Sequence, residues 1–206
     1  MTKGAIISHQ LGMFIPILYI CAVDKKQQII EAALQLLVEK GIHAAPMSAI
    51  ATAAKTGMGT IYNHFENKEA LINAIYVDIK LQEAMIFEAL FNDEPVKTQF
   101  ELYYRTAIDF FVQRPLYFQF MEQLQASPMI TEETRAIGYK AIEPVIRLLK
   151  QGQAEGIIKD IAVNELLQFL GGTILSHLRW HFNQQQTASS NAMENQLRLT
   201  WDAIKA

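Results

Sequence analysis

Hydrophobic residues recur along most of the chain with the three-to-four-residue spacing of an amphipathic helix. The first clear instance lies at residues 24–40, where the apolar positions are Ile30, Ala33, Leu34, Leu37 and Val38. This i, i+3, i+4, i+7, i+8 pattern places the apolar side chains on one face of a helix. Gly41 follows at the kind of position where a helix commonly ends. The pattern therefore predicts an amphipathic helix over residues 24–40.

The same spacing, interrupted by turn-forming residues, predicts a series of further helices. They span 47–54, 58–65, 68–91, 96–114, 116–125, 131–155 or 132–155, 163–186 and 192–205. We expect Pro144 to kink the 131–155 helix, because a proline in a helix interior removes a backbone hydrogen bond. Apolar and polar residues do not alternate, as they do in a β-strand, over a useful length. The sequence therefore predicts an all-α protein.

The first 23 residues form a segment of different character. Residues 11–23 are nearly all apolar, but a membrane-spanning helix needs roughly 20 such residues, and Pro16 interrupts this stretch. Three interpretations stay open: a translated start upstream of the natural one, an arm that packs on the protein or on a membrane surface, and a secretion signal. Our expectation for the patterned part is a cytoplasmic protein without a membrane partner.

Composition narrows the class of protein. The chain has 206 residues, of which 50% are hydrophobic and 19% charged, which excludes general disorder. The single cysteine, Cys21, excludes an intrachain disulfide framework. The formal net charge is only -3, so a nucleic-acid site, if present, has to be local rather than a basic field over the whole molecule.

Two short helices joined by about four residues, within 46–68, describe a helix-turn-helix. Ala51 and Ala54 are small at positions where the two helices must cross closely, and Ile50, Ile61 and Phe65 can form the core beneath them. The groups left for the outer side are Met58, Thr60, Tyr62, Asn63 and His64. Several of these side chains can hydrogen-bond to phosphates and base edges, as a DNA-reading helix requires.

The charge pattern supports a DNA-facing surface at the same place. Acidic residues are absent between Glu39 and Glu66, and Lys40 and Lys55 fall within this interval. Because a duplex repels carboxylates, an acid-free interval suits DNA, and Lys55 joins the candidate contacts. Residues 24–70 carry five lysines against five acids, so this domain has no net charge.

The segment resembles the DNA-binding signature of TetR-family transcriptional regulators. The resemblance rests on Ile50-Ala51, on Gly59-Thr60-Ile61-Tyr62-Asn63-His64-Phe65 and on Lys68-Glu69-Ala70-Leu71. It implies phosphate contacts from Ser48, Thr60, Tyr62, His64 and Lys68, and base-edge contacts from Met58, Gly59 and Asn63. Two positions depart from the family pattern: Lys55 stands at a left-handed turn position, and Ala45 replaces the usual hydroxyl cap, which leaves Pro46 to start the second helix.

Residues 71–206 are expected to form a helical domain that binds a ligand and dimerises. Aromatic residues are dense over 100–125 and could line a site for a flat apolar ligand, with a plain helical core as the alternative. The candidate ligand contacts are Tyr103, Phe110, Phe118, Met121, Glu122 and His177. Asp109 and Glu122 stand among apolar neighbours, and acids lining a cavity would favour a cationic lipophile.

The last two long helices carry the candidate dimer interface. His177 and His181 have the i, i+4 spacing of two zinc ligands, but a third ligand is missing, so we predict an interface or pocket lining and no metal or other cofactor. The resemblance implies that these helices form a four-helix interface between two copies. The candidate interface residues are Leu167, Leu170, Ile174, His181, Leu197 and Trp201.

Together these observations predict a two-domain homodimeric transcriptional regulator that is not an enzyme. Residues 24–70 would bind a near-palindromic double-stranded DNA operator, and residues 71–206 would bind a small lipophilic effector that releases the operator, the mode of a repressor. One alternative is a helical dimer that binds DNA or a protein without a small-molecule ligand. A more distant alternative is an enzyme that uses His177, His181, Asp109 and Glu122.

Overall fold

A computed structural model describes residues 25–90, 93–124, 127–183 and 191–206. The apolar segment 1–23 lies outside the described residues, as do the ends predicted at 91, 125 and 186. The helices are α1 (Lys25–Lys40), α2 (Met47–Ala53), α3 (Met58–His64), α4 (Lys68–Leu90), α5 (Val96–Val112), α6 (Pro115–Leu124), α7 (Glu132–Ala141), α8 (Glu143–Ala154), α9 (Val163–Asn183) and α10 (Ala192–Ile204). Within the described ranges, the only strand-like pairing is an isolated bridge between Ile158 and Lys205. The predicted all-α class is therefore confirmed.

One predicted helix is wrong as a single element. The segment 131–155 forms two helices, because Ile142 leaves the helical conformation (φ -102°, ψ 14°) between α7 and α8. Pro144 lies in the first turn of α8, where the hydrogen bond that proline cannot donate is not required. The proline thus helps to start a new helix instead of kinking a continuous one.

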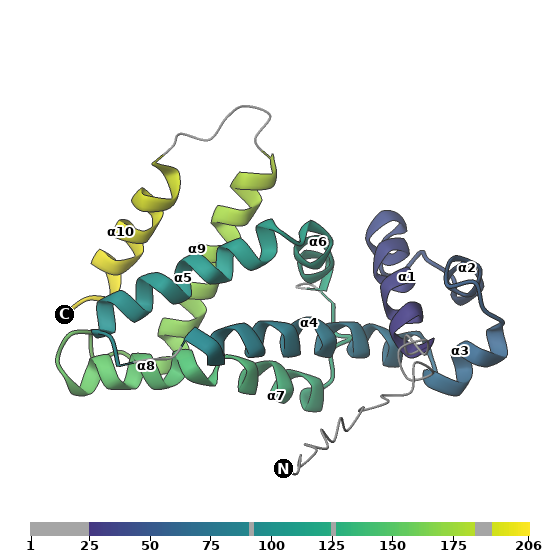
Figure 1. The fold of residues 1–206 in the computed structure, drawn as a ribbon, viewed down its shortest axis with the longest axis horizontal. Coiled ribbons are helices and arrows are strands. Elements are labelled where there is room, and N and C mark those ends of the chain that lie inside the picture. Colours follow the sequence, from purple (N-terminus) through teal and green to yellow (C-terminus); the bar gives the residue numbers. More distant parts are fainter. Residues whose placement is uncertain (1–24, 91–92, 125–126, 184–190) are drawn as a thin grey trace, which may run out of the picture.

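Helices α1, α2 and α3 form a small bundle at one end of the molecule (Figure 1). Ile50 and Ile61 are fully buried in its core, and Ala51 and Ala54 are almost fully buried, as close packing of α2 on its neighbours requires. Ala45 is also buried, and Pro46 precedes α2 as its cap residue instead of being its first helical residue. The departure at Ala45 thus adds to the core of the bundle.

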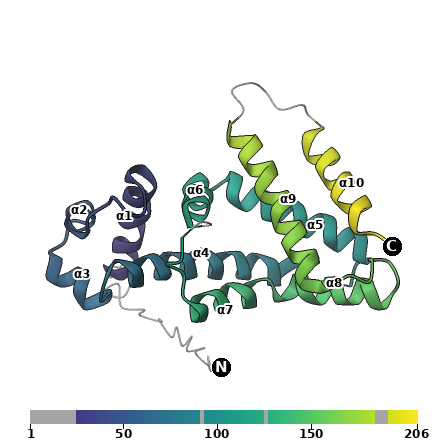
Figure 2. The ribbon, with the colours of Figure 1, turned by 180° about the vertical axis from the view of Figure 1, so that it is seen from behind.

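Helix α4 connects this bundle to the rest of the chain (Figures 1 and 2). Its 23 residues span about 35 Å, since an α-helix rises 1.5 Å per residue. It contacts α1 near its start and α5, α7 and α8 further along. The domain boundary that we predicted at 70/71 falls inside this continuous helix, so α4 belongs mechanically to both parts.

The larger part packs α5 against α8, α9 and α10. A buried hydroxyl network joins three of these helices. Tyr104 Oη lies 2.9 Å from Thr173 Oγ1 of α9 and accepts from Gln196 Nε2 of α10 at 3.0 Å. Tyr104 is fully buried, so these bonds fix the position of α9 and α10 relative to α5. None of the described helices combines the length and hydropathy of a membrane-spanning segment.

Gly152 in α8 is required by close packing. A Cβ atom there would lie 2.5 Å from Ile158 Cδ1, 2.7 Å from Ile158 Cγ1 and 3.0 Å from Val96 Cγ1. We expect Gly152→Ala to lower the free energy of unfolding by about 1–2 kcal/mol, because overpacking outweighs the better helix propensity of alanine. Urea denaturation measures this. Gly171→Ala in α9, where no atom lies within 4 Å of the added Cβ, is the matched control and should not lose stability; equal behaviour of the two variants would contradict the packing argument.

Candidate functional site

The turn between α2 and α3 has the geometry of a helix-turn-helix. Lys55 adopts φ 49°, the only left-handed conformation at a non-glycine residue in the described ranges, as its turn position led us to predict. The turn is closed by backbone hydrogen bonds from Lys55 N–H to Thr52 O at 3.1 Å and from Thr56 N–H to Ala51 O at 3.0 Å. A lysine in this conformation costs roughly 1 kcal/mol. The turn connects α2 directly to α3, the third helix of the bundle.

Helix α3 divides its residues between a buried and an exposed face. Ile61 is fully buried, and Phe65, just after the helix, is 3% exposed. Tyr62 has 49% of its surface exposed, which is high for a large aromatic residue. Of the remaining candidates, Ser48, Lys55, Gly59, Asn63 and His64 are exposed, whereas Met58, Thr60 and Lys68 are half-buried. All nine predicted DNA contacts are therefore accessible on or beside α2, α3 and the start of α4.

The start of α4 is tied to the loop before α2. Asn67 Oδ1 accepts from Ala70 N–H at 2.8 Å and so caps the start of this helix. Lys68 Nζ donates to His43 O at 2.9 Å, and partial burial lowers the pKa of Lys68 from its ordinary value. A lysine ammonium has three N–H donors, so this bond leaves two for other acceptors such as phosphate oxygens.

A substitution at Gly59 can distinguish the stability of α3 from its fit to DNA. An added Cβ would meet no atom within 4 Å, and glycine is a poor helix former. We expect Gly59→Ala to raise the free energy of unfolding by about 0.5 kcal/mol and to weaken operator binding about tenfold, because the methyl group occupies space that a base edge needs. Thermal melting and fluorescence anisotropy measure the two effects. A stabilised variant with unchanged operator affinity would remove Gly59 from the interface.

A cavity of about 220 Å³ lies among α4, α5, α6 and α9. Its lining residues are Lys80, Glu83, Tyr103, Ala107, Phe111, Phe118, Met121, Ile142, Leu167, Leu170, Gly171, Ile174 and Leu175. Of the predicted ligand contacts, Tyr103, Phe118 and Met121 line it. Phe110 instead packs against Phe111, with ring centroids 5.1 Å apart. The cavity is thus mostly apolar, with a polar edge contributed by α4.

The polar edge is an ion pair that the sequence analysis missed. Lys80 Nζ lies 2.5 Å from Glu83 Oε2, and the two side chains are 14% and 7% exposed. Burial works against the charge of Lys80, but the nearby Glu83 carboxylate outweighs it and leaves the pKa of Lys80 raised. Burial, with a smaller contribution from Glu83, raises the pKa of Tyr103. The residues 75, 79, 83 and 87 form one stripe of α4 in which Glu83 is the only polar member, and this was the available sequence signal.

The acids that suggested a cationic ligand do not line the cavity. Asp109 is exposed. Glu122 forms a two-pronged ion pair with Arg179 of α9, with Nε to Oε2 at 2.8 Å and Nη2 to Oε1 at 3.0 Å. The acid that does line the cavity, Glu83, is already paired with Lys80. The expectation of a cationic lipophile therefore loses its basis.

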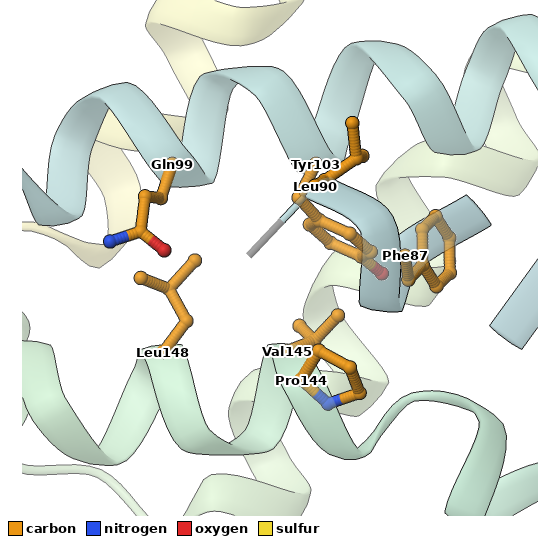
Figure 3. A pocket seen from close by; sticks show the side chains of 7 residues that line it. All are labelled: Phe87, Leu90, Gln99, Tyr103, Pro144, Val145 and Leu148. Atoms are coloured by element: carbon orange, nitrogen blue, oxygen red, sulfur yellow. The ribbon is translucent and has the colours of Figure 1, made fainter. Parts of the chain in front are cut away.

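A second, smaller cavity of about 20 Å³ adjoins the first and is shown in Figure 3. It is lined by Phe87, Leu90, Gln99, Tyr103, Pro144, Val145 and Leu148. Tyr103 is common to both cavities. Gln99 Oε1 is the single buried side-chain oxygen or nitrogen of the described residues for which no hydrogen-bond partner is found.

Helix α6 carries a direct contact to the DNA-binding bundle. Gln123 Nε2 donates to Val38 O at 3.1 Å, and Gln123 Oε1 accepts from Ile42 N–H at 3.0 Å. In a continuing helix Ile42 N–H would itself donate to Val38 O, but α1 ends before Gly41, which has φ 89°. The Gln123 amide replaces that missing bond. The sequence could not predict this contact, because Gln123 lies 81 residues from Ile42 and 85 residues from Val38.

The histidine pair on α9 is placed near α10 and not in the cavity. His177 is buried, its ring centroid lies 5.7 Å from that of Trp180, and burial followed by the nearby His181 lowers the pKa of His177. His181 packs edge-on against Phe182 at 5.1 Å. Within the described ranges, His, Cys, Asp and Glu side chains do not gather in threes that could hold a metal ion.

Most of the predicted dimer residues lie inside one protomer. Leu170, Ile174, Leu197 and Trp201 are buried there, and Leu167 lines the larger cavity. The periodicity correctly marked the apolar stripes of α9 and α10, but these stripes face α5 and each other. The large apolar residues that are exposed on the two helices are Phe169, Trp180 and Leu199.

Comparisons with known proteins agree with this architecture. The family model of bacterial regulatory proteins of the tetR family matches residues 29–75, and that of the tetracyclin repressor-like C-terminal domain matches residues 95–205. The fold and the helix-turn-helix define a transcriptional regulator of the helix-turn-helix class. The chain belongs to the TetR family, which confirms the resemblance and excludes the enzyme interpretation.

The individual relatives are also named as transcriptional regulators. The HTH-type transcriptional regulator YhgD of Bacillus subtilis is 27% identical over 136 residues, which span 63% of this chain and 63% of YhgD, less than two thirds of that relative. The crystal structure of a tetR family transcription regulator from Shewanella sp. PV-4 matches with a TM-score of 0.80 and 26% identity, over 88% of this chain and 98% of that chain. FadR from Bacillus subtilis, solved in complex with stearoyl-CoA, matches with a TM-score of 0.71 and 23% identity, over 86% and 98% of the two chains.

Proposed function

We propose that this protein represses transcription by binding a near-palindromic operator as a homodimer and releases it when a small effector enters the 220 Å³ cavity. The observation that carries the DNA-binding part is the face of α3. It exposes Tyr62, Asn63 and His64 while burying Ile61. Side chains with hydrogen-bonding groups on an accessible short helix after a tight turn suit phosphates and base edges. This function requires the cytoplasm, where operator DNA is accessible.

The dimer is supported by the exposed surfaces of α9 and α10. Phe169, Trp180 and Leu199 are 39%, 40% and 66% exposed. We assign the interface to these residues in place of the buried leucines, since exposed aromatic and aliphatic side chains bury most surface on association. A dimer is also what the DNA function needs, because one short recognition helix reads too few base pairs to be selective.

The effector is proposed to be small and mostly apolar. A cavity of 220 Å³ is larger than the roughly 150 Å³ that accommodates benzene, and lies below the usual range of roughly 300–1,000 Å³ for ligand pockets. FadR of Bacillus subtilis binds the much larger stearoyl-CoA. Lys80, Glu83 and Tyr103 are the polar members of the lining.

Two structural connections can transmit effector binding to the DNA-binding bundle. Helix α4 is continuous from Lys68 beside the recognition helix to Glu83 at the cavity. Helix α6 lines the cavity with Phe118 and Met121 and reaches α1 through Gln123. An effector shifts the equilibrium only if it binds the released arrangement more tightly than the DNA-bound one.

The α6 connection gives a specific prediction. Gln123→Met keeps the size of the side chain but removes both hydrogen bonds to the end of α1. We expect faster hydrogen exchange at the Ile42 amide and about fivefold weaker operator binding, because the bundle is no longer held in one orientation. Gln119→Met, at an exposed position of the same helix, is the control. Unchanged exchange at Ile42 would show that this contact does not hold the bundle.

Selection from a random duplex pool tests the proposed function. We expect enrichment of an inverted repeat whose half-sites lie about one helical turn, or a multiple of it, apart. Enrichment of a single half-site would contradict the dimer. Absence of enrichment from folded protein, also with residues 24–206 alone, would contradict specific DNA binding.

A further inference from the structure

Helices α4 and α5 both contribute lining residues to the two cavities. Helix α4 lines them with residues 80, 83, 87 and 90, and α5 lines them with residues 99, 103, 107 and 111. Steps of three or four residues keep side chains on one face of a helix. The same two faces therefore continue from the larger cavity into the smaller one, and Tyr103 stands at the division.

Tyr103 is held at this division by its neighbours. Its ring packs edge-on against Phe87 with centroids 4.9 Å apart. The pKa of Tyr103 is raised by burial and then by the charge of Glu83, so its hydroxyl stays neutral and able to donate. Tyr103 lines the smaller cavity beside Phe87 (Figure 3) and also lines the larger one, so its ring stands between the two spaces as long as it keeps this rotamer.

Gln99 closes the far end of the smaller cavity. The residue is 6% exposed, and its Nε2 donates to Glu94 O at 2.6 Å, which fixes the orientation of the amide. Its Oε1 has no hydrogen-bond partner and points into the space beside Leu148 (Figure 3). A buried acceptor without a donor is costly in a folded protein, so this atom is suited to receive a donor from a bound molecule.

We propose that the two cavities are the ends of one elongated effector site, with Gln99 Oε1 as the acceptor for a ligand hydroxyl or amide N–H. This rests on the proposed function and names the ligand class for the same site. The apolar body of the ligand lies in the larger cavity, and its donor-bearing end passes Tyr103 to reach Gln99. The effector is therefore a slender apolar molecule that ends in an uncharged hydrogen-bond donor.

The lining of the smaller cavity determines this choice of end group. Phe87, Leu90, Val145 and Leu148 supply no countercharge, so a charged head group would lose its hydration without compensation. A carboxylate is excluded for a second reason, because it has no hydrogen to give to Gln99 Oε1. A free volume of about 20 Å³ exceeds what one water molecule needs, so a terminal hydroxyl fits without repacking.

A pair of isomers tests this proposal. 1-Decanol and nonyl methyl ether have the same atoms and nearly the same shape, but only the alcohol can donate. We expect isothermal titration calorimetry to give about tenfold tighter binding of the alcohol to the full-length protein, the effect of one hydrogen bond. In Gln99→Met both compounds should bind with affinities within twofold of each other. Gln113→Met, at an exposed position after α5, should keep the tenfold preference.

Tyr103→Ala provides the second measurement. Removing the ring joins the two spaces, so both isomers should bind more tightly to this variant, with the preference for the alcohol retained. Equal binding of the isomers to the wild-type protein would overturn the role of Gln99, as would a preference that persists in Gln99→Met. Binding of neither isomer would overturn the elongated site. Operator binding, followed in parallel by anisotropy, reports separately on the proposed function.

Discussion

Replacing Lys80 with methionine is expected to lower the free energy of unfolding by about 3–5 kcal/mol. The variant leaves the Glu83 carboxylate in a nearly buried position at the edge of the apolar cavity without its partner. A carboxylate that loses both its countercharge and its hydrogen bond pays a desolvation cost that nothing in its surroundings offsets. Urea denaturation at neutral pH measures the loss.

The double variant Lys80→Met/Glu83→Leu is the control for this prediction. It removes both charges and should recover most of the stability, because well-packed apolar residues often replace a buried ion pair without loss. A double variant as unstable as Lys80→Met would indicate a packing defect. A single variant as stable as the wild type would show that Glu83 is hydrated.

The ion pair between Lys80 and Glu83 also makes the stability of the protein depend on pH. A lysine whose pKa is raised in the folded protein contributes stability that is fully present below its ordinary pKa of 10.5 and is lost as the pH rises through the raised value. Tyr103, whose pKa is also raised, acts in the same direction above 10.0. Stability should therefore fall at alkaline pH, and less steeply in Lys80→Met. An equal fall in both proteins would assign the alkaline loss to other groups.

Replacing Tyr62 with alanine is expected to weaken binding to the selected operator by about 100-fold. A hydrogen bond to a charged phosphate contributes about 1.5 kcal/mol or more, and a dimer loses it at both half-sites. Tyr62 is 49% exposed, so the free protein should keep its stability. Fluorescence anisotropy on the operator and on an unrelated duplex should show a similar loss on both, because a phosphate contact carries no sequence information.

Lys68→Ala separates charge from hydrogen bonding at the same surface. It should weaken binding and lower the slope of log affinity against log salt by about 0.9 per phosphate, hence by about 2 for a dimer. Tyr62→Ala should leave that slope unchanged, and Tyr62→Phe isolates the hydroxyl. Unaltered affinity in both alanine variants would contradict the assignment of this face to DNA.

Much of the fold could be predicted from sequence because its signals are local. The period of apolar residues located the helices, and the cap at Asn67 and the left-handed turn at Lys55 depend on residues within three or four positions. The same period places Ile61 in the core, and this predicts which face of α3 is exposed. Pro144 was misjudged because proline has two roles in helices, and only the conformation of Ile142 decides between them.

The effector site was harder to predict because it depends on how the helices meet. Periodicity shows that Leu170 and Leu197 lie on apolar stripes, but not whether a stripe faces its own domain or a second copy. Glu122 has the same sequence surroundings as an acid in a cavity, yet a partner 57 residues away places it beside Arg179. Gln99 and Gln123 act through contacts that nothing near them in sequence indicates.

The most direct test of DNA recognition by α3 is hydrogen exchange of the full-length protein with and without the selected inverted repeat. We expect slower exchange of the backbone amides of α3, residues 58–64, and of the start of α4 near Lys68 when the repeat is bound. A scrambled duplex of equal length should give less protection. Protection confined to other helices, with exchange of α3 unchanged on the bound repeat, would show that this helix does not read the operator.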